Sequence, residues 1–560
     1  MGESMKEKLV DSYVARRSAN YKPNIWNYDY LQSLESIYQG EKYEREAEAL
    51  KHEVSYILIN SVENPLIINY KLELIDEISK LALSHYFEEE IRQVLNSTTT
   101  TTTSTSTIYH QDPYLIALYF RILRQNGHNV SPDALVSLMD EEGFIRNAHF
   151  DAKAIIEIFE ASHLGMEDEF MLDRAKALAT NCLMRLSKSS AHEDNIINIY
   201  HSANNYFPLH WSVCWFNVKK HMMIQHDDEK NYSTALLRLG RLSFNMVQLQ
   251  HQTELKKLLR WWRSSGLLEV LNFTRDRVVE SFLWTIGVAY EPQYGNLRIW
   301  LTKAITLVLI IDDVYDIYGS NQELQQLTSA IERWDTSEIQ KFPEPIKRCF
   351  WALYDTVNDM DLEIQRVKGW NSVLSHMKKV WTDFCKALLV EATWYHKGCT
   401  PSFREHLDNG WTSSSGYVLS LYILFGVGQD MATTMNILNN SQEIIYRVSL
   451  IIRLCNDLGT SKMELERGDA PSSILCYMRE SNVTEEEARG HIRNIITYSW
   501  KKINDSFISS SRSEQPILKY IINAARVVNF IYQDGDGFGD QDRETRDQIL
   551  SCLIQPLPLA

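Results

Sequence analysis

The sequence has few residues that interrupt helices. Its 560 residues include 22 glycines and 13 prolines, against usual frequencies of about 7% and 5%. No stretch alternates apolar and polar residues as a half-buried strand does, whereas YLIALYFRILRQ, AKAIIEIFEAS and LKKLLRWWRS repeat apolar residues every three or four positions. We therefore expect an all-α protein.

The sequence also lacks paired cysteines, long apolar runs and a recognisable targeting segment. The eight cysteines are scattered without a CxxC pair, which is typical of reduced thiols. No run reaches the roughly 18 apolar residues that a membrane helix needs. The stretch MGESMKEKLVDSYVARR has no apolar core and contains Glu3, Glu7 and Asp11, although transit peptides generally lack acidic residues. We expect a cytoplasmic protein without a membrane partner.

Positive charge is in short supply as well. The formal net charge is −16, from 73 acidic and 57 basic residues, and such a field disfavours binding to nucleic acid. An anionic substrate would need arginines or bound metal ions close to it.

Two polar segments divide the chain. The tract NSTTTTTTSTST at 96–107 has the composition of a mobile loop between helices. The charged segment QHDDEKNYS at 225–233 separates two helical blocks, and a chain of this length is expected to form two or more domains. We predict a boundary there, giving domains 1–230 and 231–560. The chemistry should lie in the second, because most acid and arginine clusters follow the boundary.

The stretch LVLIIDDVYDIYGS ends an apolar run with Asp312, Asp313 and Asp316. Residues three and four apart lie on one side of a helix, so these carboxylates converge at its end. Burying like charges is costly without a cation, and Mg²⁺ prefers a few carboxylates with water and substrate phosphates. A solvated helix face is the alternative, which the apolar run at 307–311 disfavours.

A second polar stripe occurs in RLCNDLGTSKMELERGD. Asn456, Thr460 and Glu464 stand four residues apart, and all three offer oxygen ligands that Mg²⁺ accepts. Asp457 is adjacent, and Arg453 lies one turn earlier, where it could bind a phosphate through two N–H groups. Alone, this stripe would be ordinary surface. Together with the upstream aspartates, it indicates a metal site with two sides.

Two arginine motifs complete the pattern. FTRDRVVESFLW places Arg275 and Arg277 around Asp276, and neighbouring guanidinium groups favour a shared anion such as a polyphosphate. A surface pair bound to nearby acids is the alternative. RRSANYKPNIW places two arginines at 16–17, nine residues before Trp26.

In the order RRx8W, RDR, DDxxD and (N/D)Dxx(S/T)xxxE, these motifs resemble those of plant terpene synthases. The resemblance covers essentially the whole chain and includes EPQY, ERWD and CYMRE. LVLIIDDVYDIYGS, FCKALLVEATWY and YQDGDGFGDQ are most similar to the branch that holds isoprene, β-ocimene and α-farnesene synthases.

The resemblance implies an N-terminal α-barrel, whose first 30 residues strap over the C-terminal domain, and a C-terminal helical bundle with the catalytic cavity. It implies a prenyl diphosphate substrate bound through three Mg²⁺ ions, which Mn²⁺ can replace. Two ions would be held by Asp312, Asp313 and Asp316, and the third by Asn456, Thr460 and Glu464. The departing diphosphate would be bound by Arg275, Arg277 and Arg453.

A carbocation would need aromatic faces and a dry pocket. Trp284, two helical turns after Arg277, is our first candidate for the pocket wall, followed by Tyr532, Tyr417 and Phe425. Plain core packing is the alternative for each. The family also implies that NGWTSSSGYVLS breaks a helix beside the cavity, with K⁺ as a further possible ion, and YQDGDGFGDQ is expected to form a loop near the cavity mouth.

The resemblance implies a monomeric enzyme that ionises a prenyl diphosphate. Monoterpene synthases of the family usually work in plastids, so the lack of a transit-peptide pattern favours farnesyl diphosphate as substrate and the acyclic sesquiterpene (E,E)-α-farnesene as product. A monoterpene synthase that makes (E)-β-ocimene or linalool from geranyl diphosphate stays open, because the family associates RRx8W with monoterpene formation. A non-catalytic helical scaffold or prenyl-lipid carrier is the alternative of another class, although it would not require every ligand position to be intact.

Overall fold

The computed structural model describes residues 16–60, 65–101, 112–139, 152–189, 207–225, 234–538, 541 and 543–559. Within these ranges the chain is helical and contains no β-strand, so the prediction of an all-α protein is confirmed. None of the described helices is both long enough and apolar enough to span a membrane.

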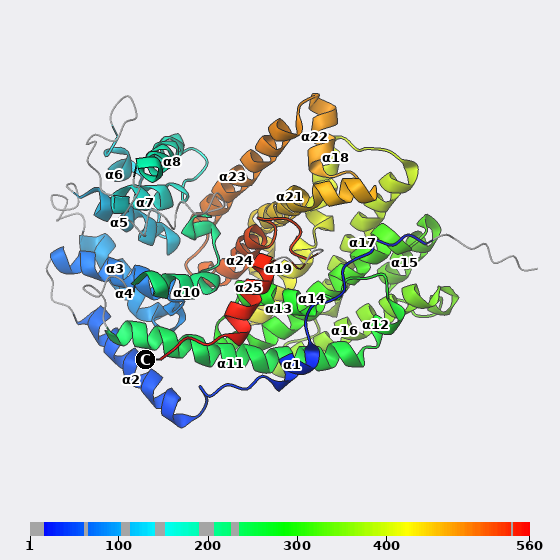
Figure 1. The fold of residues 1–560 in the computed structure, drawn as a ribbon, viewed down its shortest axis with the longest axis horizontal. Helices are drawn as coiled ribbons and strands as arrows, with labels where there is room; N and C mark the ends of the chain where they lie inside the picture. Colours follow the sequence, from blue (N-terminus) through cyan, green and yellow to red (C-terminus); the bar gives the residue numbers. More distant parts are fainter. Residues whose placement is uncertain are drawn as a thin grey trace, which may run out of the picture.

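The helices before residue 230 gather at one end of the molecule (Figure 1). They are α1 (Tyr28–Ser33), α2 (Glu41–Ile59), α3 (Pro65–Lys80), α4 (Glu88–Thr101), α5 (Pro113–Gln125), α6 (Asp133–Val136), α7 (Ala152–Ser162), α8 (Phe170–Ser189) and α10 (Cys214–Gln225). Helix α1 is the exception, because it lies beside α11 in the larger group.

The later helices form the larger group. They are α11 (Thr234–Ser264), α12 (Leu267–Val270), α13 (Val278–Val288), α14 (Gly295–Asp313), α15 (Asn321–Arg333), α16 (Glu344–Lys368), α17 (Leu374–Lys397), α18 (Phe403–Ser413), α19 (Gly416–Val427), α20 (Met431–Asn440), α21 (Gln442–Arg467), α22 (Ser473–Ser481), α23 (Glu485–Ser509), α24 (Gln515–Ile531) and α25 (Arg543–Ile549).

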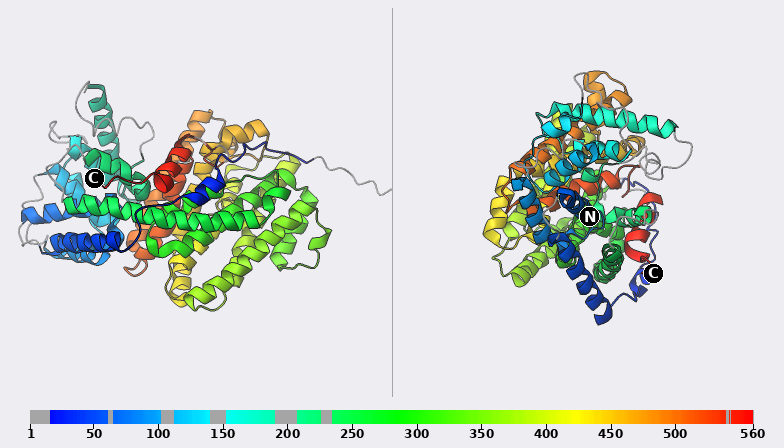
Figure 2. Two further views of the ribbon diagram at one scale, coloured as in Figure 1. Left: turned by 60° about the horizontal axis from the view of Figure 1, so that its bottom comes forward. Right: turned by 90° about the vertical axis from the view of Figure 1, so that its left-hand side faces the viewer.

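Helix α11 connects the two groups. It runs along one edge of the molecule (Figures 1 and 2) and packs against α2 as well as α13 and α14. The buried apolar side chains of α2, α3 and α4 belong to the same core as those of the later helices, while α6, α7 and α8 pack in a smaller core and α5 contributes to both. The boundary at residue 230 therefore stays a prediction.

Local signals in the sequence set many helix ends. Ser320 and Glu323 form a capping box at the start of α15, which satisfies backbone N–H groups that have no partner inside the helix. Gly369 and Gly398 end α16 and α17 with positive φ angles, a conformation that costs glycine little. The polar tract after residue 95 does not behave as expected, because α4 continues through its first residues to Thr101. Thr98 is buried there and bonds back to the Val94 carbonyl; the rest of the tract lies outside the described residues.

A row of amides on α11 holds the C-terminal segment. Asn245 Nδ2 donates to the Leu557 carbonyl at 2.8 Å, and Gln252 Nε2 donates to the Leu553 carbonyl at 2.7 Å. The spacing puts both amides on one face of the helix. The end of the chain is thereby fixed beside the helix that joins the two groups.

A buried ion pair joins α11 to α14. The Arg298 guanidinium donates to Glu254 at 2.6 and 2.8 Å and to the carbonyls of Ala289 and Glu291 at 2.6 and 2.8 Å. The Arg298 side chain is fully buried. The pair therefore fixes how α14, which ends in the predicted metal ligands, sits against α11.

We predict that Arg298→Ala lowers the free energy of unfolding by about 3–5 kcal/mol, because it leaves Glu254 buried and unpaired. Thermal melting followed by circular dichroism measures the effect. Arg404→Ala is the control, since its pair with Asp408 is exposed, at 89% and 65% of the side chains, and such pairs contribute about 0–1 kcal/mol. Equal melting temperatures for the two variants would contradict the assignment.

Candidate active site

The three predicted aspartates lie where α14 ends. Asp312 and Asp313 are its last residues, and Asp316 lies in the π-helical turn η4 (Val314–Tyr318). We expected one continuous α-helix, but the chain widens into a π turn, a distortion that often marks functional sites. Asp313 is 1% exposed and Asp312 is 33% exposed.

Arg275 lies between the first two carboxylates. Its Nη2 is 2.7 Å from Asp312 Oδ2 and 2.9 Å from Asp313 Oδ1, and its backbone N–H donates to Asp313 Oδ2 at 2.9 Å. Burial nevertheless raises the pKa of Asp313 to about 6. Burial, followed by repulsion from Asp312, raises the pKa of Asp316 well above its usual range. One guanidinium therefore offsets only part of the cost of placing these acids together.

The second polar stripe lies on α21. Burial, followed by repulsion from Asp457, raises the pKa of Glu464 to about 8. Thr460 Oγ1 donates to the Asn456 carbonyl at 2.9 Å, so this hydroxyl keeps its lone pairs available as acceptors. Glu464 also contributes to the raised pKa of Asp316, which shows that the two acidic elements are close enough to repel each other.

Asp457 serves a different purpose from its neighbours. It accepts hydrogen bonds from His406 Nε2 at 3.1 Å and from the Ser473 N–H at 2.8 Å, and it pairs with Arg453 Nε at 3.0 Å. Despite full burial, Arg453 and His406 hold the pKa of Asp457 well below its usual range. This carboxylate fastens α18 and α22 to α21.

A further acid, Glu391 on α17, was missed by the sequence analysis. Arg453 Nη1 lies 3.2 Å from both its oxygens, and Ser413 Oγ and Asn409 Nδ2 donate to it at 2.5 and 3.2 Å. It also helps to raise the pKa of Asp312 and that of Asp316. A lone glutamate within the apolar run ALLVEA was the signal that could have indicated it.

These elements surround a cavity of 110 Å³. Six of the predicted site residues line it: Arg275, Trp284, Asp312, Arg453, Asn456 and Tyr532. Much of the remaining wall is apolar, from Ile305, Val308, Leu309, Leu419, Ile452, Val528 and Phe538. The cavity therefore has a charged end and an apolar body.

The other predicted residues lie outside this wall. They are Arg277, Asp313, Asp316, Thr460 and Glu464, together with the weaker aromatic candidates Tyr417 and Phe425. Phe425 is fully buried against Trp370. Phe425 is therefore a core residue and does not line the cavity.

The predicted helix break is present. Helix α18 ends at Ser413, Ser415 has a φ of 63°, and α19 starts at Gly416. Side chains at 413–415 line the cavity. A Cβ at Gly416 would lie 2.7 Å from the Ser449 Cα on α21, so glycine allows the broken helix to approach α21 closely.

Arg277 does not face the cavity. Its guanidinium is buried and donates to the carbonyls of Phe538 at 2.6 Å, Asp276 at 2.9 Å and Lys22 at 3.0 Å. It thereby ties two distant segments to the cavity rim: the N-terminal segment and the turn that ends at Phe538, which itself lines the cavity. A diphosphate-binding role for Arg277 stays a prediction.

The segment 16–27, here termed the strap, crosses both acidic elements. Arg16 pairs with Glu323 at 2.6 Å, next to η4, and Arg17 pairs with Asp469 at 2.8 Å, just beyond α21. Tyr21 donates its hydroxyl to Asp313 Oδ1 at 2.9 Å. In Figure 1 this dark blue segment runs across the larger group of helices toward α15. The strap therefore covers the charged end of the site.

The donor set suits Mg²⁺ bound together with a ligand. Within the described residues no three His, Cys, Asp or Glu side chains converge into a closed metal site. Mg²⁺ commonly binds through one or two carboxylates and completes its shell with water and substrate phosphates. Burial and neighbouring acids raise the pKa values of Asp313, Asp316 and Glu464. A cation bound beside these carboxylates would therefore stabilise their charged forms. Carboxylate, hydroxyl and amide oxygens thus fit the ion.

Comparison with known proteins gives consistent matches. Residues 263–502 match the model of the terpene synthase family, metal binding domain, and residues 25–203 match that of the terpene synthase N-terminal domain. An α-farnesene synthase from Ricinus communis is 45% identical over 97% of this chain and 96% of its own length.

Two solved structures share the fold. A limonene synthase crystallised with 2-fluorolinalyl diphosphate is 32% identical, with a TM-score of 0.91 over 97% of this chain and 100% of its own. An isoprene synthase from grey poplar (Populus x canescens), in complex with three Mg²⁺ ions and dimethylallyl-S-thiolodiphosphate, is 35% identical, with a TM-score of 0.85 over 96% and 99% of the two chains.

We predict that replacing Arg16 and Arg17 together by alanine releases the strap without unfolding the helices. Two partly exposed pairs contribute roughly 1–2 kcal/mol in sum, so chymotrypsin should cleave at 21–26 about tenfold faster. Arg45→Ala, which breaks an exposed pair with Glu41, should leave this rate unchanged. Cleavage as slow as in the unmodified protein would show that these arginines do not hold the strap.

Proposed function

The chain belongs to the terpene synthase family, and we propose that it converts farnesyl diphosphate into the acyclic sesquiterpene (E,E)-α-farnesene with release of diphosphate. The observation that carries the proposal is the cavity itself. Two arginines, Asp312 and Asn456 line its charged end, and the rest of its wall is largely apolar and includes Trp284. The α-farnesene assignment rests on the 45% identity to the Ricinus communis enzyme.

We propose that Mg²⁺ ions are held by Asp312, Asp313 and Asp316 on one side and by Asn456, Thr460 and Glu464 on the other. When bound, such ions would neutralise the diphosphate and stabilise the charge that develops on the leaving oxygen. Mn²⁺ as a substitute, and K⁺ beside the helix break at 413–415, are further proposals.

Arg275 and Arg453 are the proposed diphosphate ligands. Both line the cavity and both are held in place by acids, Arg275 by Asp312 and Asp313, and Arg453 by Glu391 and Asp457. This preorganises their N–H groups for the oxygens of a departing diphosphate. Arg277 and the strap close the rim and exclude water.

The apolar body of the cavity suits a carbocation. The indole face of Trp284 attracts a cation. Tyr532, whose pKa is raised by burial, keeps its proton. The other polar side chains of the wall are two arginines, an asparagine, three serines and Asp312, a proposed metal ligand. We therefore propose that the released diphosphate removes the proton. The cation then becomes a hydrocarbon, because the apolar wall and the closed rim exclude water.

Geranyl diphosphate is the second candidate substrate. The 110 Å³ cavity is smaller than the usual ligand pocket of about 300–1,000 Å³, and a C10 chain requires less rearrangement than a C15 chain. The similarity to a limonene synthase supports the same alternative, with (E)-β-ocimene or linalool as the product. A cytoplasmic location and a monomeric state stay predictions.

We predict that the purified protein converts farnesyl diphosphate to α-farnesene when Mg²⁺ is present and that EDTA abolishes turnover. Gas chromatography coupled to mass spectrometry identifies the products, with geranyl diphosphate, Mn²⁺ and K⁺ as parallel arms. Turnover of geranyl diphosphate alone would replace the sesquiterpene proposal with the monoterpene one. Absence of turnover with both substrates would favour a scaffold or lipid carrier.

We also predict that Asp312→Ala lowers kcat by about 10²–10³-fold or more, in line with the loss of one group that stabilises transition-state charge. The melting temperature should not fall, because the substitution removes a carboxylate whose pKa is raised by burial. Asp383→Ala, at a partly exposed pair with Lys379 on α17, should retain full activity. Near-normal turnover by Asp312→Ala would sink the proposed metal site.

A further inference from the structure

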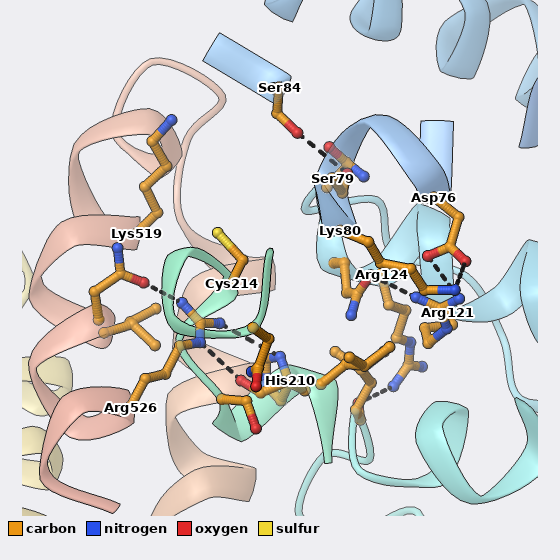
Figure 3. Close-up of a pocket in the computed structure, with 18 of the residues that line it drawn as sticks. Asp76, Ser79, Lys80, Ser84, Arg121, Arg124, His210, Cys214, Lys519 and Arg526 are labelled. Carbon is orange, nitrogen blue, oxygen red and sulfur yellow. Dashed lines mark hydrogen bonds and ion pairs between the residues drawn. The ribbon is translucent and has the colours of Figure 1, made fainter. Parts of the chain in front are cut away.

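A second cavity lies between α3 and α5 on one side and α24 on the other (Figure 3). Its volume is 270 Å³, and it shares no lining residue with the catalytic cavity. Its charged lining consists of five cations and two carboxylates: Lys80, Arg121, Arg124, Lys519 and Arg526, with Asp76 and Glu291. Positive charge therefore predominates on its wall.

Four of these cations are neutralised by acids. The pairs are Lys80 with Asp76 at 2.7 Å, Arg121 with Asp76 at 2.9 Å, Arg124 with Glu169 at 2.5 Å and Lys519 with Glu88 at 2.9 Å. Arg526 is the exception, because no described carboxylate lies within ion-pair distance of it. Glu291 also lines the cavity but is not the ion-pair partner of Arg526: its Oε1 accepts a hydrogen bond from the Tyr520 hydroxyl at 2.9 Å.

The Arg526 guanidinium has only neutral partners in the described structure. Its Nε donates to the His210 carbonyl at 2.7 Å, its Nη1 donates to Asn523 Oδ1 at 2.6 Å, and its Nη2 lies 3.5 Å from His210 Nδ1. A guanidinium carries five N–H donors, so donors remain for a further acceptor. Burial lowers the pKa of Arg526 to about 10, which reflects the cost of a buried charge without a counter-charge.

Three histidines report the same positive field. Burial is the main cause that lowers the pKa of each imidazole, and a neighbouring cation is the next: Arg526 for His210, Lys519 for His85 and Lys80 for His221. Together they lower the pKa of each imidazole to about 3. All three rings are therefore neutral near pH 7, and they can offer hydrogen bonds without adding charge.

We propose that this cavity binds a small oxyanion of the phosphate class, with Arg526 and Lys519 as its charged ligands. Arginine binds phosphate oxygens through paired N–H groups. In Figure 3, Arg526 and Lys519 lie on one side of the cavity and Lys80, Arg121 and Arg124 on the other. A bound anion would complete the missing ion pair and join α24 to α3 and α5.

Two sources could supply this chemistry: inorganic phosphate, and the diphosphate that the proposed reaction releases. Both carry oxygens of the same kind, so separate titrations must distinguish them. The site itself does not depend on the proposed reaction, and its test needs no turnover.

The test is isothermal titration calorimetry without divalent metal, at constant ionic strength, with inorganic phosphate and with diphosphate as separate titrants and sodium chloride as the blank. We expect Arg526→Gln to weaken phosphate binding at least tenfold. Arg453→Gln is the matched control, since it removes a buried arginine from the catalytic cavity instead. It should leave phosphate affinity within twofold of that of the unmodified protein.

The outcomes are distinct. Binding that is lost in Arg526→Gln and kept in Arg453→Gln supports the proposal, and the tighter titrant identifies the source. The opposite pattern would place the anion in the catalytic cavity and overturn it, as would no binding to the unmodified protein. If Arg526→Gln does not fold, Lys519→Gln serves, because its side chain is 34% exposed. Unchanged affinity in that variant would equally overturn the proposal.

Discussion

The proposed catalytic cavity depends on the Arg275 guanidinium between the carboxylates of Asp312 and Asp313. Buried carboxylates at a helix end repel one another and lose their hydration. Arg275 offsets part of this cost and links the segment before α13 to the end of α14. Arg453 does the same for Glu391 and Asp457 on the other side. The acids are thus held in place yet still short of positive charge, which is the condition a divalent cation meets.

Closure of the site follows from hydrogen bonds to carbonyl groups rather than from apolar packing. Arg277 joins the Lys22 and Phe538 carbonyls, which come from opposite ends of the chain. The strap then pairs with acids beside both of the proposed metal-binding elements. The ion pairs of the strap are partly exposed, so they can open and re-form at modest cost, whereas the Arg277 hydrogen bonds are buried. A rim that opens to admit a substrate and closes against water requires this property.

The two cavities have opposite charge balances. Six acids lie near the two arginines of the proposed catalytic cavity: Asp312, Asp313, Asp316, Glu391, Asp457 and Glu464. In the cavity between α3, α5 and α24, by contrast, Arg526 has no carboxylate partner among the described residues. Helix α24 contributes to both, through Val528 in the first and Arg526 in the second. In each case the uncompensated charge is buried, and a ligand of opposite charge would relieve the cost.

Much of the fold and of the site could be read from the sequence, because helical period, low glycine and proline content and motif spacing are local properties. They predicted an all-α chain and a shared site for residues such as Asp312 and Asn456, which line one cavity. The family resemblance added the helix break within NGWTSSSGYVLS, which the structure places at 413–416. The sequence could not reveal the π turn, the role of Glu391, the carbonyl partners of Arg277 or the missing counter-charge of Arg526. The last three depend on groups that meet across tens to hundreds of residues, which only tertiary packing decides, while the π turn is a local distortion after α14 that the helical period does not signal.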